Sequence, residues 1–188
     1  MTIEEFRDLL RDHADEIRGA YADRWPRMMR KEAVEHYREG FRQGGFTDTS
    51  LERWDKTRRQ DVPFNGSLGK YGPLQSRSND MMSSIDGRTE PGAVVIFSDS
   101  DHARYHNEGA TATVTARMRK YFWARHAEAK RHYGKDNAET EFWRNMALIR
   151  SAQIHIPKRK FIGASATLMK RIEDVIRRDI ERILRGDS

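Results

Sequence analysis

The fold is decided by the C-terminal stretch SATLMKRIEDVIRRDIERILRG, residues 165–186. Its large aliphatic residues recur at intervals of three and four, which predicts an amphipathic helix. Ser165 is placed to cap the start of this helix and Gly186 to end it. We expect the apolar face to cover a sheet of its own subunit, with a coiled coil or partner helix as the alternative. The face consists of Leu168, Ile172, Val175, Ile176, Ile180, Ile183 and Leu184.

Two more helices are predicted at the N-terminus. Thr2 and Glu5 have the spacing of a capping box, and apolar residues follow at helical intervals as far as Ile17. A second helix is predicted from about Trp25 to the Gly-Gly pair at 44–45, because the proline that follows Trp25 suits a first helical turn. We expect both helices to be core elements.

The middle of the chain predicts a loop, strands and an insertion. Segment 46–72 is rich in Gly, Asn, Asp, Ser and Thr and predicts a long loop, with Trp54 as its packing anchor or as an interface residue. GAVVIFS at 92–98 predicts a buried strand, and alternation at 111–115 and 153–157 predicts two pairing strands. Residues 111–152 are predicted to form a basic, mostly helical insertion within the domain. The expected fold is α+β in a single domain, residues 1–188, with a small antiparallel sheet packed on N-terminal and C-terminal amphipathic helices.

Composition excludes several kinds of chemistry and predicts self-association. The absence of cysteine excludes disulfides, zinc thiolates and thiol nucleophiles. The chain is 37% hydrophobic and 34% charged, a lean balance that suggests additional burial against neighbouring subunits. No secretory leader and no stretch of transmembrane length is recognisable, so we expect no membrane contact and synthesis in the cytosol.

The positive charge is concentrated in one segment. Residues 111–160 contain twelve Lys and Arg against four Asp and Glu, a net charge of +8, and the remaining 23 basic and 25 acidic residues give −2. This asymmetry predicts a contact with phosphate groups or with an acidic protein surface.

No complete catalytic motif is present. GSLGK at 66–70 has the wrong spacing for a P-loop, and the sequence around Ser165 lacks the second glycine of a nucleophile elbow. DSDHARYHNE at 99–108 gathers two His residues with Asp and Glu, but the glycine that follows favours a polar turn over a metal or catalytic site. We expect no enzyme activity, cofactor or metal, and a metal-dependent nuclease centred on His102 and His106 is the enzymatic alternative.

The insertion also supports a nucleic-acid hypothesis, because cations alternate there with the aromatic run at 121–123. Sequence-neutral contact with passing DNA would explain it, and the alternative is a solvated basic face over core aromatics. The residues concerned are Arg117, Arg119, Lys120, Arg125, Lys130, Arg131, Lys158, Arg159 and Lys160.

From about Ala33 onward, the order of motifs resembles the Mu-like phage virion morphogenesis and tail-completion family. A helix that ends in Gly-Gly is followed by Trp54, GPLQSRSNDMMSSI, a strand, DHARYHNEG and IHIPKRKFIGAS before an amphipathic helix. The most telling residues form two family-like turns: Tyr105, His106, Asn107, Glu108 and Gly109 in the first, and Ile156, Pro157, Phe161 and Gly163 with the intervening basic residues in the second.

The resemblance implies a small α+β fold and a ring of identical subunits at the head–tail junction of the virion. Assembly would take place in the cytoplasm of the bacterial host, with connector or tail proteins as partners and without catalysis. The turns would then have a structural role. One departure is the long basic insertion between the turns, whose role the resemblance does not supply.

Overall fold

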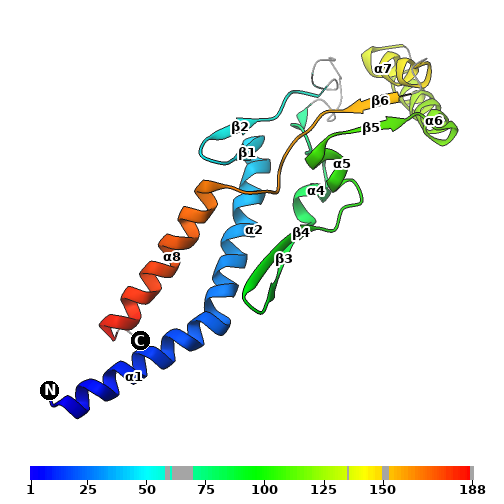
Figure 1. Cartoon of the computed structure of the whole chain (residues 1–188). Coiled ribbons are helices and arrows are strands. Elements are labelled where there is room, and N and C mark those ends of the chain that lie inside the picture. Colours follow the sequence, from blue (N-terminus) through cyan, green and yellow to red (C-terminus); the bar gives the residue numbers. More distant parts are fainter. Residues whose placement is uncertain (58–59, 61–69, 135, 150–152, 187–188) are drawn as a thin grey trace. The chain divides into compact units, whose positions relative to one another are not determined.

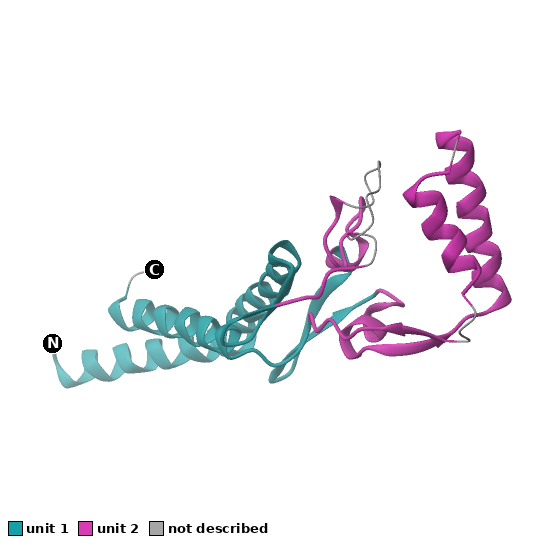
Figure 2. Cartoon of the chain, turned by 90° about the horizontal axis from the view of Figure 1, so that it is seen from above, with its two compact units in different colours: residues 1–52, 83–99, 162–188 teal, residues 53–82, 100–161 magenta. Residues whose placement is uncertain are grey.

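A computed structural model describes residues 1–57, 60, 70–134, 136–149 and 153–186 (Figure 1). The chain forms two compact units, each assembled from separate segments (Figure 2). Unit 1 contains residues 1–52, 83–99 and 162–188, and unit 2 contains residues 53–82 and 100–161. That the chain forms a single domain stays a prediction.

Unit 1 begins with an unbroken helical path. Helix α1 (Ile3–Gly19) continues through a π-helical turn, η1 (Ala20–Arg24), into α2 (Trp25–Gln43). The predicted capping box of Thr2 and Glu5 is present, and Gly44 ends α2 in a left-handed conformation with φ of 72°. The expected break before Trp25 is absent. The wider π turn accommodates Pro26, which lacks a backbone N–H and whose ring crowds the preceding turn.

The C-terminal helix α8 (Ala166–Arg185) packs on α2 and on the end of α1. Ile183 packs with Ala20 and Trp25 in an apolar cluster that is extended by residues of all three helices. Asp179 lies within α8 at 8% exposure; its carboxylate accepts a hydrogen bond from Trp25 Nε1 at 2.7 Å and pairs with Arg24 at 2.8 Å. The helix therefore covers helices of its own subunit and not mainly a sheet.

Two hairpins complete unit 1. Strands β1 (Gly45–Thr47) and β2 (Leu51–Arg53) form the first hairpin, within what the sequence predicted as a loop. Its turn binds the start of α8, because Asp48 Oδ1 accepts the N–H of Ala166 at 2.7 Å. Strands β3 (Ile85–Glu90) and β4 (Ala93–Ser98) form the second hairpin, which lies against α2. The predicted strand at 92–98 is present, but its expected burial is wrong, because Ala93 is exposed and the other residues of β4 are half-buried.

Unit 2 contains the predicted insertion. Strand β5 (Ala110–Thr113) pairs antiparallel with β6 (Gln153–Ile156), which confirms the expected pairing. Between them lie the helices α6 (Ala116–Tyr133) and α7 (Ala138–Ala147), packed on each other. The polar turn expected around His106 is instead a short helix, α5 (Ala103–Glu108). A four-residue helix, α4 (Asp80–Ser83), precedes β3.

The α+β class is confirmed, but the expected sheet is divided. Among the described residues the strands form three separate antiparallel pairs. These described strands are three to six residues long, and each pairs with a single strand of the described ranges. None of the described helices is long and apolar enough to cross a membrane.

Candidate interaction surfaces

The two family-like turns meet in unit 2. The N–H of Arg159 donates to the carbonyl oxygen of His106 at 2.7 Å, and the N–H of Phe161 donates to Asn107 Oδ1 at 2.8 Å. Phe161 is almost fully buried, at 2% exposure. The end of α5 and the segment after β6 are thus joined by hydrogen bonds across more than forty intervening residues.

Gly109 allows these segments to approach closely. Its φ of 77° lies in the left-handed region, and a Cβ atom at this position would lie 3.1 Å from the backbone nitrogen of Lys158. A side chain would strain the backbone and press on a peptide group that cannot easily move. The glycine that the sequence indicated as a turn residue is therefore also a packing requirement.

His106 is the buried member of the histidine pair. Burial, with a smaller contribution from the positive charge of Arg159, lowers its pKa below the ordinary value, which favours the neutral imidazole. Its Nδ1 atom is buried without a hydrogen-bond partner among the described residues. The ring lines a hollow of about 420 Å³ together with His102, Ser100 and Asp80. Within the described ranges, no group of three or more His, Asp or Glu residues is arranged to hold a metal ion.

Two residues of the segment 53–57 contact the basic turn at 158–160. Trp54 Nε1 donates to the carbonyl oxygen of Lys160 at 2.8 Å, and Arg159 Nη2 donates to that of Asp55 at 3.1 Å. Arg159 is only 6% exposed, so its guanidinium group supports the turn and does not face outward. Lys158 is the exposed cation of this turn.

The remaining turn residues have simpler surroundings. Tyr105 is 52% exposed on α5, and Glu108 forms an exposed ion pair with Arg104. Ile156 ends β6 and is followed by Pro157, both half-buried. In unit 1, the carbonyl oxygen of Gly163 accepts a hydrogen bond from the Tyr37 hydroxyl at 2.7 Å.

The α6–α7 hairpin has an aromatic core that uses several of the predicted cations. Phe122, at 7% exposure, stacks on Trp143, and the Arg125 guanidinium lies over the same indole ring, 5.4 Å from its centroid. Arg125 also pairs with Glu128. Arg119 Nη1 donates to the carbonyl oxygen of Ile149 at 2.8 Å, just after α7 ends. Arg119 and Arg125 thus stabilise the hairpin.

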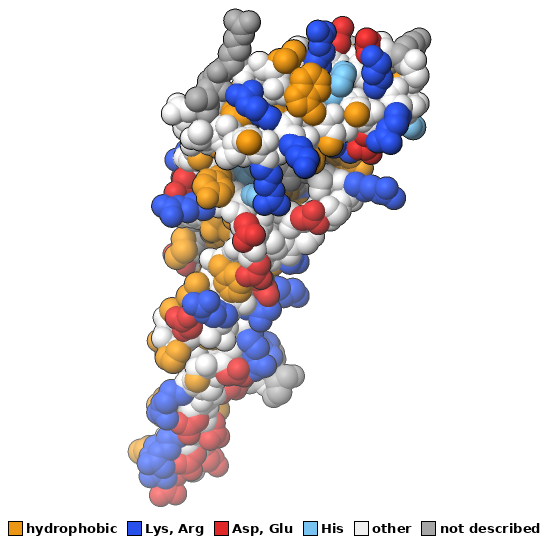
Figure 3. Space-filling model, turned by 90° about the vertical axis from the view of Figure 1, so that its right-hand side faces the viewer, with side chains coloured by type: hydrophobic (Ala, Val, Ile, Leu, Met, Phe, Trp, Pro, Cys, Tyr) orange, Lys and Arg blue, Asp and Glu red, His pale blue; other side chains and the backbone are white. Residues whose placement is uncertain are grey.

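Other cations of α6 face outward. Arg117, Lys120 and Arg131 are exposed, and among the described residues no ion pair or hydrogen bond of their side chains is found, whereas Lys130 pairs with Asp136 at 3.5 Å. Tyr121 and Trp123 are also exposed, at 56% and 44%. Figure 3 shows blue side chains around exposed orange ones in its upper part. The predicted basic surface is therefore reduced to a few cations interspersed with aromatic rings.

The N-terminal helix presents a second exposed surface, which the sequence analysis missed. It predicted a core helix, but no residue of α1 is buried. The apolar residues of its first turns are exposed, at 88% for Ile3, 47% for Phe6, 43% for Leu9 and 51% for Leu10. The available signal was the six acidic residues among the seventeen of this helix, a density unusual for a buried element.

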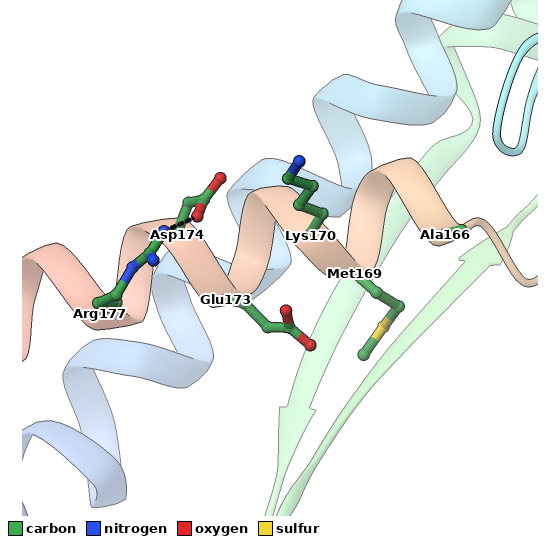
Figure 4. Close-up of a pocket in the computed structure, with 6 residues that line it drawn as sticks. All are labelled: Ala166, Met169, Lys170, Glu173, Asp174 and Arg177. Atoms are coloured by element: carbon green, nitrogen blue, oxygen red, sulfur yellow. Dashed lines mark hydrogen bonds and ion pairs between the residues drawn. The ribbon is translucent and has the colours of Figure 1, made fainter.

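A third surface, a shallow hollow on α8, is lined by residues of that helix alone: Ala166, Met169, Lys170, Glu173, Asp174 and Arg177 (Figure 4). Asp174 and Arg177 pair with each other, and the other side chains point outward. Without polar groups converging from a second element, this hollow does not define a ligand site.

Comparison with protein-family models, curated proteins and solved structures finds no match for this chain. The assignment of a function therefore depends on the described surfaces and on the motif resemblance.

Proposed function

We propose that this chain is a non-enzymatic structural subunit of phage virion assembly, a ring-forming protein of tail completion or head–tail joining. It would be located at the head–tail junction, with copies of itself and connector or tail proteins as partners. The motif order indicates this class of protein, and one structural observation supports it. Helix α1 is capped, amphipathic and seventeen residues long, yet it buries none of its residues.

An unburied amphipathic helix is costly for a protein that acts alone. Large apolar side chains in water forgo about 1.5–3 kcal/mol each of possible burial energy. Four such side chains, Ile3, Phe6, Leu9 and Leu10, are clustered within three turns of one helix. Exposed apolar clusters of this kind mark protein–protein contacts. The helix is therefore suited to binding a partner during assembly.

The arrangement of the two turns also suits a structural role. His106 and Asn107 bind the backbone of the second turn, and Arg159 is held between them and the segment 53–57. The His106 carbonyl, the Asn107 side chain and the Arg159 guanidinium group all form internal hydrogen bonds. They fix the backbone of the segment that follows β6 within unit 2, as expected of a scaffold.

The proposal is tested in virions produced from a genome that encodes this chain. Immunogold labelling and mass spectrometry of purified particles should detect the chain at the head–tail junction. Loss of the gene should give unjoined heads and tails, or tails of defective length. Complete particles that lack the chain, or normal joining without the gene, would contradict the proposal.

A second candidate function is contact with duplex DNA through α6. It is favoured by the three exposed cations Arg117, Lys120 and Arg131, whose charges have no ion-pair partner in the described parts of the chain. Such a contact would be sequence-neutral and salt-dependent, because it would depend on released counterions.

Reversal of two of these charges tests the second candidate. The pair Arg117→Glu and Lys120→Glu should weaken binding to duplex DNA and lower its salt dependence. The matched control is Lys170→Glu with Arg177→Glu on α8, which changes the net charge equally. Equal losses in both variants would indicate a non-specific charge effect and not a DNA site on α6.

A further inference from the structure

We infer that the N-terminal part of α1 is the self-assembly element. In this arrangement, α1 helices of neighbouring copies pack in parallel through their apolar stripes, and the basic flank of one helix faces the acidic flank of the next. The inference deepens the proposed function, on which it rests, by naming the surface that joins the ring subunits.

The apolar stripe of α1 continues beyond the part that its own subunit covers. Ile3, Phe6, Leu10 and Ile17 follow one another at intervals of three, four and seven residues, so they share one face. Ile17 packs on the apolar cluster with Ile176 and Ile180 of α8. Figure 1 shows the N-terminal end of α1 extending past the end of α8. The first three turns therefore carry the same stripe without a cover.

Charges are sorted to the two sides of this stripe. At about 100° per residue, three arginines lie along one flank and three acidic residues along the other. The basic flank consists of Arg7, Arg11 and Arg18, and the acidic flank consists of Glu5, Asp12 and Glu16. Toward the lower end of Figure 3, basic and acidic side chains lie on different sides.

Opposite flanks specify the orientation of the neighbour. In a parallel pair of helices, each flank meets the opposite flank of the next helix, whereas a two-fold antiparallel pair brings like flanks together. For α1 the parallel arrangement joins arginines to carboxylates at similar heights along the helix. The antiparallel arrangement places arginine beside arginine. Parallel contacts of this kind repeat around a closed ring.

The existing ion pairs of these flanks can be exchanged. Arg7 and Arg11 contact Asp8 at 3.2 and 3.9 Å, and Arg18 contacts Asp15 at 2.5 Å. The arginine side chains in these pairs are 56–77% exposed. Exposed pairs of this kind contribute about 0–1 kcal/mol each. The flank arginines therefore remain available to a neighbouring helix.

The charge of α1 disfavours a lipid surface as the occupant. Six acidic residues and three arginines give the helix a net charge of −3. Helices that lie on membranes are typically rich in Lys and Arg, because biological membranes carry anionic lipids. A second copy of the same helix supplies both the apolar stripe and the complementary flank.

Reciprocal charge reversal tests the inference in the full-length chain. One variant, Arg7→Glu with Arg11→Glu, makes both flanks acidic. The other, Asp12→Lys with Glu16→Lys, makes both flanks basic. Each variant alone should self-associate about tenfold more weakly than the wild type, because like charges then meet. An equimolar mixture should regain self-association, since the two variants can alternate around a ring.

The control neutralises two charges on the back of the same helix, Asp8→Asn with Asp15→Asn. It releases Arg7, Arg11 and Arg18 from their exposed pairs and should self-associate at least as strongly as the wild type. Sedimentation equilibrium gives the oligomeric state, and far-UV circular dichroism shows whether each variant keeps its helix. If self-association is lost in each variant and returns when the two are mixed, misfolding of either variant does not explain the loss.

Several outcomes would overturn the inference. If both variants assemble normally, or the mixture does not recover, α1 is not the joining surface, and the proposed function stands on the particle experiment. A wild-type chain that stays monomeric in the same measurement also overturns it. Absence of the chain from purified particles contradicts the proposed function itself. If the two variants do not associate on mixing but the wild-type chain binds vesicles of anionic lipid, α1 is assigned to a membrane surface.

Discussion

At the residue scale, two side chains hold together segments that lie far apart in the sequence. Asn107 uses its side-chain oxygen to accept the backbone N–H of Phe161, and Asp179 accepts hydrogen bonds from both Trp25 and Arg24. In each case a buried donor depends on an acceptor from another element. Substitution of the acceptor leaves the donor in place, which costs more than removal of both partners.

Asn107→Ala should lower the free energy of unfolding by about 1–3 kcal/mol, because the N–H of Phe161 loses this acceptor in a buried position. Urea unfolding followed by circular dichroism measures the change. Glu108→Ala is the control, since its ion pair with Arg104 is exposed, and it should change stability by less than about 0.5 kcal/mol. Equal effects of the two substitutions would show that the bond contributes little.

Asp179 should make unit 1 sensitive to acid. Burial alone would raise the pKa of this carboxyl group, but hydrogen bonds from Trp25 and Arg24 and the charges of Arg24 and Arg182 lower it below the ordinary value. A carboxyl group with a lowered folded-state pKa contributes stability above the unfolded-state pKa of about 3.9 and loses it as the pH falls through the folded-state value.

Asp179→Asn should therefore lower the free energy of unfolding by about 1–3 kcal/mol at neutral pH, where the carboxylate is charged. The difference from the wild type should narrow below about pH 4. Chemical unfolding across a pH series measures both stabilities. A difference that stays constant down to about pH 2 would show that the ionisation of Asp179 does not contribute.

At the element scale, the α6–α7 hairpin separates a core position from an exposed one within two adjacent residues. Phe122 is 7% exposed and stacks on Trp143, whereas Trp123 is 44% exposed. Phe122→Ala should cost about 3–5 kcal/mol through lost burial and the cavity it leaves. Trp123→Ala should change stability far less. Thermal unfolding compares the two, and similar losses would contradict the described orientation of α6.

Periodicity predicted the helices and the β5–β6 pairing because the apolar residues of α8 and the alternating residues of β5 repeat regularly. It failed where long-range contacts decide the structure. The short helix α5 is fixed at its end by the bonds from Arg159 and Phe161, and the β1–β2 hairpin is held by the start of α8 through Asp48. No local pattern contains those partners.

The basic surface could be predicted only in part, for a related reason. Charge counts located it in the insertion but could not separate Arg119 and Arg125, which support the hairpin, from Arg117 and Lys120, which face outward. That distinction requires the direction of each side chain around α6. The exposure of α1 was missed because an amphipathic helix with an unfilled face has the same periodicity as a buried one.

At the scale of the whole molecule, the oligomeric state of the chain should depend on its concentration. Removal of residues 1–14, which carry the exposed apolar stripe, should leave a folded monomer, because none of these residues is buried. The full-length chain should instead show an oligomer whose fraction rises with concentration. Light scattering across a dilution series checks this. An oligomer that persists in the shortened chain would assign assembly to another surface.

The π-helical turn at 20–24 keeps the apolar residues of α1 and α2 on one side of a continuous helical path. A π turn contains one more residue between hydrogen-bonded groups than an α turn, so it takes up an extra residue without rotating the helix that follows by about 100°. Ile17, at the end of the α1 stripe, therefore packs on the same apolar cluster as Trp25 and Met28 of α2. If the same number of residues formed a regular α-helix, the stripe of α1 would point about 100° away from this cluster. The direction in which the exposed stripe points is thus set by a single wide turn.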